Sequence, residues 1–161
     1  MLQEKAIKIG FPRALLYHKY APMWTHFFRA INCQIITSPN TNRAILDQGI
    51  QYSIDENCLA VKIFLGHVHY LLDKVDYIFI PRIYCLHEQE EICVKLYALG
   101  DIVRNTFRNV HILEYTVDRE KKQDELSGMV QIGLKLGRSL QQTRQAYNEA
   151  VCVWIEHQNT K

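Results

Sequence analysis

Short apolar segments alternate with longer helical segments along most of this 161-residue chain. Four segments are expected as strands: residues 6–11, 33–37, 75–83 and 110–115. The third of them has a nearly continuous apolar centre, which is typical of a strand buried on both faces. Since one helical stretch separates each strand from the next, the pattern predicts a parallel sheet with right-handed crossovers. The chain is therefore constrained to an α/β fold.

The segments between the strands carry helical signals. Residues 14–31 have a wide apolar face at helical spacing, and Pro12 suits the first helical position before them. Three more helices are predicted at residues 43–54, 58–74 and 94–107, the first of them interrupted near Gly49. Asp55 or Asn57 is expected to cap the second.

The last quarter of the chain is expected to be helical throughout. One helix is predicted at residues 121–136, with Gly137 as a break after it. Ser139 then begins another helix, with Gln142 as its capping-box partner. An apolar stripe along that helix, formed by Tyr147, Ala150, Val151 and Trp154, requires either the sheet domain or a partner to cover it.

Composition excludes several classes of protein. The chain is 48% apolar and 22% charged, with a net charge of +2, which is ordinary for a soluble globular domain. We find no dense Lys/Arg stripe and no apolar run of about 20 residues, so neither a nucleic-acid nor a membrane surface is expected. Five irregularly spaced cysteines and an N-terminus without a signal-peptide pattern predict a reducing, cytoplasmic location.

The cysteines are the main candidates for chemistry. Cys58 and Cys93 are both predicted where helices begin, a position that favours the thiolate. Loops after parallel strands meet at one edge of the sheet, so these two cysteines and Cys85 can share a rim. There is no CxxC motif, which argues against a structural zinc site, but dispersed cysteines can still hold an iron–sulfur cluster. For Cys33 and Cys152 we expect ordinary packing.

Three cationic side chains lie near the same edge. Arg13 and Arg82 each follow a proline at a strand end and could bind an anion or a substrate. The alternative is an ion pair, for which the acidic candidates are Glu56, Glu88 and Asp101. Lys62 lies one helical turn after Cys58 and is expected either to stabilise a thiolate there or to be solvated. No dinucleotide-binding fingerprint, P-loop or nucleophile-elbow motif is present.

Two histidines lie in the middle of the helix that Cys58 begins. His69 returns to the face of Cys58 but about three turns, or roughly 16 Å, along the helix. That separation is too large for a shared metal. We therefore expect His67 and His69 to serve in core or surface packing.

A series of short motifs resembles a known family. In chain order they are Ile9–Tyr17, Ser38–Asn42, Asp55–Lys62 with Gly66-His67, Asp76–Arg82, Ile92-Cys93 and Gly100-Asp101. Together they resemble the bacterial family usually called acyl-CoA dehydratase activase-related, which is similar in turn to the 2-hydroxyacyl-CoA dehydratase subunits. The resemblance covers residues 8–105 well and the helical tail more loosely.

The resemblance implies a domain of the kind that holds iron–sulfur clusters, possibly 4Fe–4S, in dehydratase-type proteins. The family pattern has cysteines at Cys58 and Cys93, whereas Cys85 falls outside it. Such proteins receive an electron from a separate ATP-hydrolysing activator, and their relatives usually continue into a second α/β half. Two cysteines are fewer than the usual cluster complement, so the missing ligands are expected from that half or from a partner chain.

We therefore expect a three-layer, Rossmann-like α/β domain at residues 1–118, with a mostly parallel four-stranded sheet in the order 2-1-3-4. A helical C-terminal extension, residues 119–161, is expected to pack on it or on a partner, including a second copy of the chain. The leading function is electron transfer or radical dehydration of an acyl-CoA, without ATP hydrolysis by this chain; whether the chain itself catalyses is left open. The alternatives are a cluster-free interaction or regulatory domain, and a thiol redox protein pairing Cys58 with Cys85 or Cys93.

Overall fold

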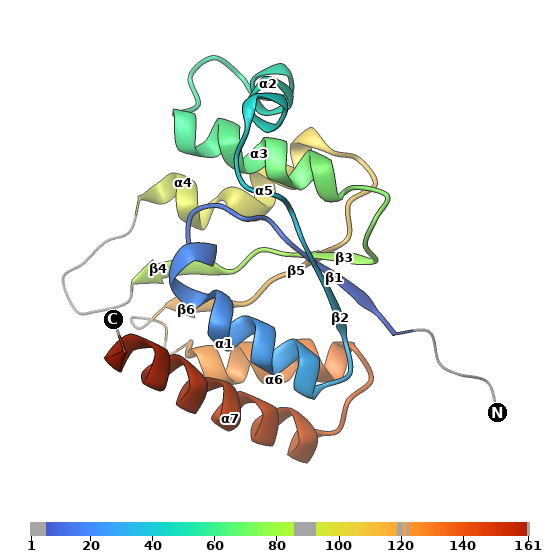
Figure 1. Cartoon of the computed structure of the whole chain (residues 1–161), viewed down its shortest axis with the longest axis vertical. Coiled ribbons are helices and arrows are strands. Elements are labelled where there is room, and N and C mark those ends of the chain that lie inside the picture. Colours follow the sequence, from blue (N-terminus) through green and yellow to red (C-terminus); the bar gives the residue numbers. More distant parts are fainter. Residues whose placement is uncertain (1–5, 86–92, 119–120, 122, 161) are drawn as a thin grey trace.

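The protein, described by a computed structural model over residues 6–85, 93–118, 121 and 123–160, consists of three layers (Figure 1). Its strands are β1 (Lys8–Phe11), β2 (Gln34–Thr37), β3 (Tyr77–Phe79), β4 (Arg82–Cys85), β5 (Ile112–Leu113) and β6 (Thr116–Asp118). Its helices are α1 (Tyr17–Ala30), α2 (Arg43–Tyr52), α3 (Leu59–Leu71), α4 (Val94–Tyr97), α5 (Leu99–Thr106), α6 (Glu125–Lys135) and α7 (Leu140–Asn159). No described helix combines the length and apolarity needed to cross a membrane.

The central sheet has the order β2-β1-β3-β5 with every pair parallel, so the predicted order 2-1-3-4 of its four strands is confirmed. Helices α3 and α5 cover one face and α1, α6 and α7 cover the other (Figure 1). Side chains alternate between the two layers along β3. Phe79 packs with the α1 layer, whereas Ile78 and Ile80 pack with the α3 layer.

The segment predicted as one strand at residues 75–83 is divided into two. β3 pairs with β5, and beyond Pro81 the same two chain segments continue side by side as a second, two-stranded sheet of β4 and β6. Proline has no N–H to donate to a ladder, so the pairing is interrupted there and resumes when Arg82 N–H donates to the carbonyl of Tyr115 at 2.8 Å. The prediction missed this small sheet because apolar periodicity continues through the proline.

Other helix predictions also need correction. α1 begins at Tyr17 with Leu16 as its N-cap, so Pro12 does not lie at its first helical position. The predicted helix at 94–107 is two helices, α4 and α5, which meet at Ala98. The expected interruption near Gly49 is absent, because α2 runs unbroken from Arg43 to Tyr52. Gly49 serves a different purpose there: a Cβ at this position would overlap the carbonyl oxygen of Lys62 in α3.

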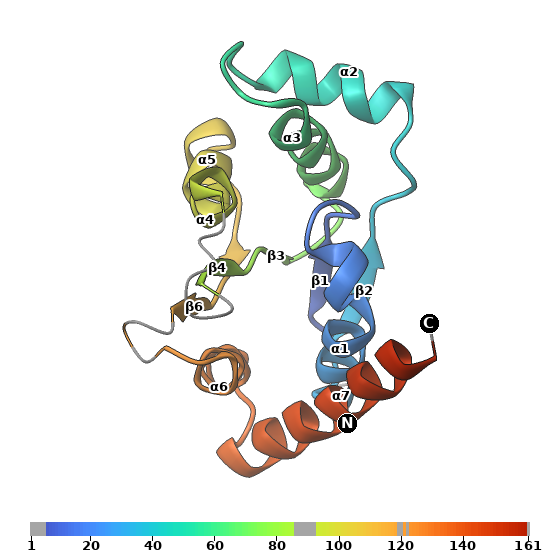
Figure 2. The same cartoon turned by 90° about the vertical axis from the view of Figure 1, so that its left-hand side faces the viewer.

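The helices α2 and α3 cross in close backbone contact. Gly66 of α3 faces α2 in the same way as Gly49 faces α3, since a Cβ on it would overlap the carbonyl oxygen of Ile45. Figure 2 shows α2 lying across the outer side of α3, away from the sheet. The position of α2 therefore depends on these two glycines.

The C-terminal extension packs on the α/β domain. Gly137, at φ +78°, ends the turn after α6, and Ser139 caps α7 by accepting a hydrogen bond from Gln142 N–H at 3.2 Å, as the sequence predicts. The apolar stripe of α7 faces α1, where the ring of Trp154 stacks on Tyr20 at 5.7 Å. Since α1 covers the stripe, it gives no reason of its own to expect a partner.

Candidate functional site

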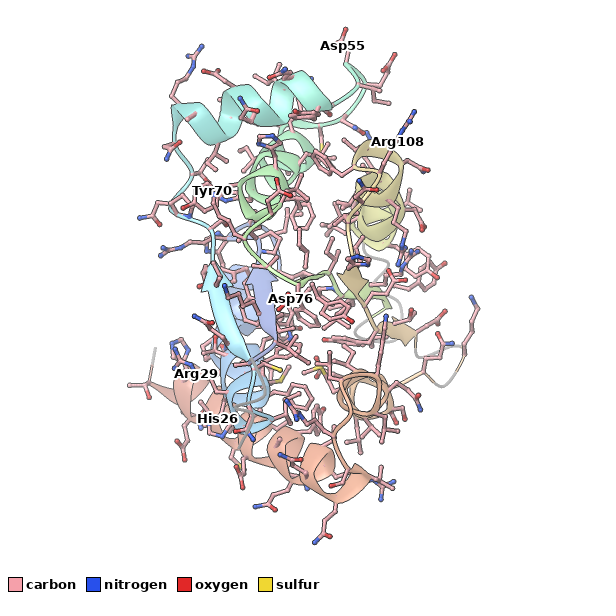
Figure 3. All side chains as sticks on the ribbon, turned by 90° about the vertical axis from the view of Figure 1, so that its right-hand side faces the viewer. His26, Arg29, Asp55, Tyr70, Asp76 and Arg108 are labelled. Atoms are coloured by element: carbon pink, nitrogen blue, oxygen red, sulfur yellow. The ribbon has the colours of Figure 1, made fainter. Side chains whose placement is uncertain are left out.

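The first residue of interest, Cys58, lies at the start of α3. It is itself the N-cap of that helix and is exposed, so the expectation that Asp55 or Asn57 caps it is wrong. Asn57 instead donates from its amide to Ser53 Oγ at 3.0 Å. Figure 3 shows Asp55 projecting outward from the loop that leads to this helix, at the far end of the molecule from His26 and Arg29.

The surroundings of Cys58 favour its thiolate form. The backbone N–H of Val61 lowers the pKa of the Cys58 thiol, and the N–H of Ala60 and the charge of Lys95 lower it further against a smaller opposing effect of desolvation. Helix N-termini and nearby ammonium groups both act in this direction. The sequence pointed to the helix start but not to Lys95, because that residue is 37 positions away along the chain.

A single hydrogen bond connects the two cysteine-bearing segments. Lys95 Nζ, in α4, donates to the carbonyl oxygen of Glu56 at 2.9 Å, two residues before Cys58. Cys93 is the N-cap of α4, and its side chain is exposed as well. Two exposed thiols therefore begin two helices, and the Lys95 side chain joins the first turn of α4 to the loop that precedes α3.

The remaining cysteines differ from these two. Cys33 is buried, and burial raises the pKa of its thiol, which agrees with the predicted packing role. Cys152 is exposed on α7, on the opposite side of the sheet from α3, so the packing role expected for it is not supported (Figure 1). Cys85 belongs to β4, but the structure does not describe its side chain. Residues 86–92, which include His87 and Glu88, lie outside the described residues.

Cys58 and Cys93 supply only some of the ligands that an iron–sulfur cluster needs. Among the described residues, no group of three or more Cys, His, Asp or Glu side chains is placed to hold a metal ion. Cys58 and Cys93 supply two accessible sulfurs, one of them biased toward thiolate, whereas cubane iron–sulfur clusters commonly take four. Any cluster held here would therefore need further ligands from outside the described part of the chain.

Arg82 belongs to an ion-pair network. Its guanidinium donates to Asp101 at 2.7 Å and to Glu114 at 2.9 Å, and Arg104 also pairs with both carboxylates. Hydrogen bonding to Asp101 raises the pKa of Arg82, and the pKa of Asp101 is lowered in turn. The predicted anion-binding role of Arg82 stays a prediction, but an incoming anion would have to compete with two carboxylates.

The other two predicted cations are held differently. Lys62 Nζ donates to the carbonyl oxygen of Asp55 at 3.2 Å, which fastens the loop before Cys58. Arg13 is fixed through its backbone, because its N–H donates to Ser38 Oγ at 2.8 Å. Its side chain is half-buried at the end of β1.

His67 holds the loop after β2 in place. It is fully buried, with Nδ1 at 2.8 Å from Ser38 Oγ and Nε2 at 2.9 Å from Thr41 Oγ1. Burial lowers the pKa of His67 to about 4, and the positive charges of His18 and Arg13 add to this effect. His67 is therefore a neutral, doubly hydrogen-bonded core residue. Sequence analysis expected packing here, but it could not identify the hydroxyl partners.

Comparison with protein families gives one match. Residues 8–161 match the family described as the CoA enzyme activase uncharacterised domain. No curated protein and no solved structure matches the chain. The match extends through the C-terminal helices, where the resemblance seen in the sequence was looser.

Proposed function

Since the chain belongs to the CoA enzyme activase domain family, a role related to acyl-CoA dehydratases is supported, and we propose that it is an iron–sulfur-associated domain of such a system. Cys58 and Cys93 supply two of the sulfur ligands. The remaining ligands come from a second α/β half or a partner chain. Electrons reach this assembly from a separate ATP-dependent activator.

One observation supports this proposal most directly. The exposed thiols of Cys58 and Cys93 begin adjacent helices that the Lys95–Glu56 hydrogen bond joins. A structural cysteine is usually buried, as Cys33 is. Cys152 is exposed too, but it lies within α7, whereas Cys58 and Cys93 each lie at a helix start. Thiolate is the form of cysteine that ligates iron.

The residues of this chain would act by holding ligands in position. A bound cluster supplies one-electron chemistry. Lys95 keeps the first turn of α4 beside the loop that precedes Cys58, and Lys62 fastens the same loop through Asp55. The backbone N–H groups of Val61 and Ala60 stabilise negative charge on the Cys58 sulfur.

The test is iron and acid-labile sulfide, measured on protein purified without oxygen. We expect Cys58→Ser and Cys93→Ser each to lose most of the bound iron while the thermal melting temperature stays near that of the wild type, because both side chains are exposed. Cys152→Ser, another exposed cysteine, is the matched control and should keep its iron. Iron content that is equal in all four proteins, or absent from the wild type even with its partner present, would contradict the proposal.

A second candidate is an interaction domain without a cluster. The exposed apolar side chains of Ile54 (64%), Leu59 (60%) and Val94 (70%) come from the two cysteine-bearing segments. Exposed apolar patches mark interaction sites, and these three side chains are candidates for such a patch. An iron-free chain that still bound its partner, and lost that binding in Leu59→Ser, would favour this candidate over cluster ligation.

A further inference from the structure

Glu125, the first residue of α6, connects three elements through its carboxyl group. Tyr115, which lies between β5 and β6, donates from its hydroxyl to Glu125 Oε1 at 2.6 Å. Tyr147 of α7 donates to Glu125 Oε2 at 3.4 Å. These three side chains, here called the Glu125 cluster, join the sheet to both C-terminal helices. They play no part in the proposed iron site.

The Glu125 cluster holds an acid partly out of water without a compensating cation. Glu125 is half-buried and Tyr115 is almost fully buried. Glu125 forms no ion pair within the part of the chain that the structure describes. The other ionisable groups near the cluster are buried Tyr20 of α1 and Asp124, the N-cap of α6, and neither brings positive charge. Such surroundings favour the neutral form of a carboxyl group.

Glu125 is the member of the cluster that can change its charge near neutral pH. Desolvation raises the pKa of Glu125 above its ordinary value of 4.5, and the hydrogen bonds from Tyr115 and Tyr147 oppose this only in part. Desolvation, and then the charge of Glu125, raise the pKa of both tyrosines above their ordinary value of 10.0. Both phenols therefore stay protonated while Glu125 gains or loses a proton.

The sheet side of the cluster is fixed, and the helices pack closely against it. The carbonyl oxygen of Tyr115 accepts a hydrogen bond from Arg82 N–H at 2.8 Å, which holds the backbone of Tyr115 in place. Gly128, one turn after Glu125, lets α6 approach the ring of Tyr115, because a Cβ at this position would overlap that side chain. A charge on Glu125 therefore acts at the contact by which α6 and α7 are held to the sheet.

We propose that Glu125 is the proton-binding site of a pH-dependent clasp between the sheet and the two C-terminal helices. When the carboxyl group is protonated, it accepts from Tyr115 and donates to the hydroxyl oxygen of Tyr147, so no charge is withheld from water. When the proton leaves to solvent, the carboxylate stays at a cost in free energy, and α6 and α7 are held less firmly. The clasp uses neither Cys58 nor Cys93, so it holds or fails independently of the cluster proposal and can be tested on iron-free protein.

The sign of the pH dependence follows from the raised pKa of Glu125. The stabilising contribution is complete below 4.5, the ordinary value, and is lost as the pH rises through the pKa of the folded state. Each unit by which folding raises this pKa makes the unfolding equilibrium constant about tenfold larger at high pH. His67 has the opposite dependence, since its pKa is lowered. The effect of Glu125 is therefore measured as a difference between wild type and a variant that keeps His67.

The first experiment compares wild type with Glu125→Gln by urea unfolding between pH 4 and pH 8. Glutamine keeps the shape of the side chain but does not titrate. We expect the unfolding equilibrium constant of the wild type, divided by that of Glu125→Gln, to rise about tenfold or more over this range. Glu156→Gln, an exposed glutamate of α7, is the matched control and should follow the wild type. Parallel curves for wild type and Glu125→Gln would overturn the proposal.

Hydrogen exchange then locates the effect in the molecule. Amide protection, corrected for the intrinsic effect of pH and read by mass spectrometry, should fall in α6 and α7 of the wild type between pH 5 and pH 8. The fall should be smaller in α3, on the other face of the sheet, and should disappear in Glu125→Gln. Tyr147→Phe removes a donor to the carboxylate, so it should deepen the loss at pH 8 more than at pH 5. Equal losses in α3 and α7 would overturn the clasp, as would losses that persist in Glu125→Gln.

Discussion

The helical layer on the α1 face of the sheet and the outer edge of the layer on the α3 face differ in how far their side chains are buried. On the α1 face, the rings of Phe11, Trp24, Phe28 and Phe79 are almost fully buried and meet mostly edge to face, with centroids 5.0 to 6.3 Å apart. On the α3 face, the outer edge instead exposes Cys58 and apolar side chains beside it. The α3 layer also has a buried core, formed by residues such as Leu65, Val68 and Leu71, but its outer edge presents an exposed thiol and exposed apolar groups.

The largest effect should distinguish the buried core of the α1 layer from the exposed edge of the α3 layer. Phe28→Ala removes a fully buried ring from the α1 layer and should lower the free energy of unfolding by about 3–5 kcal/mol. Leu59→Ala, at the exposed edge, should change it by less than about 0.5 kcal/mol. Urea unfolding followed by circular dichroism measures both. Equal losses would show that the α3 edge is part of the core.

The next largest effect on stability is expected at the crossing of α2 and α3. Gly66→Ala places a Cβ against the carbonyl oxygen of Ile45, so we expect α2 to be displaced and unfolding to become easier by about 1–3 kcal/mol. Ala44→Gly in the first turn of α2 gives a comparison for helix propensity alone, worth about 1 kcal/mol. A Gly66→Ala protein as stable as the wild type would mean that α2 is not held by close backbone contact.

His67 should make the loop after β2 sensitive to acid. Its folded pKa, about 4, lies below the ordinary value of 6.5, so between those values the unfolded chain binds more protons than the folded one. The stabilisation is complete above pH 6.5 and is lost as the pH falls to 4, by at most about 3 kcal/mol. The difference in stability between wild type and His67→Gln, followed from pH 7.5 to 4, isolates this residue. A difference that does not shrink with acid would contradict a neutral buried His67.

The smallest predicted effect is on the alkylation rates of the cysteines in iron-free protein. The pKa of Cys58 is lowered chiefly by the N–H of Val61, whereas burial raises that of Cys33. With iodoacetamide at pH 7, Cys58 should therefore react several-fold faster than exposed Cys152, and Cys33 slowest of the three. Lys95→Gln should bring the rate of Cys58 toward that of Cys152. Equal rates for Cys58 and Cys152 in the wild type would remove the evidence for a thiolate-biased site.

Sequence periodicity predicted the strands of the main sheet and most of the helices because those features depend on local apolar spacing. Periodicity did not predict features in which a proline or glycine acts through a contact with a distant part of the chain. The ladder break at Pro81 creates a second sheet only because the segment after β5 runs alongside. The low helix propensity of glycine predicts a break at Gly49. In the structure, Gly49 instead lies where the backbones of α2 and α3 are in close contact.

For the candidate site, the sequence located Cys58 and Cys93 from their positions at helix starts. It could not find Lys95 as the charge beside Cys58, nor the hydroxyl partners of His67, since these contacts join residues 26 to 39 positions apart. It also left Arg13 and Arg82 equivalent, both following a proline. Only the folded chain shows that Arg82 is paired with carboxylates, whereas Arg13 is held through its backbone N–H by Ser38.

The central claim is that Cys58 and Cys93 ligate iron, and alkylation mapping under anaerobic conditions tests it most directly. The protein would be incubated with iron and sulfide, together with its partner chain where one is identified, then treated with iodoacetamide and analysed by mass spectrometry. We expect Cys58 and Cys93 to become protected while Cys152 stays reactive. If iron is bound and both Cys58 and Cys93 are alkylated as fast as in the iron-free protein, the two thiols are not its ligands and the account is wrong.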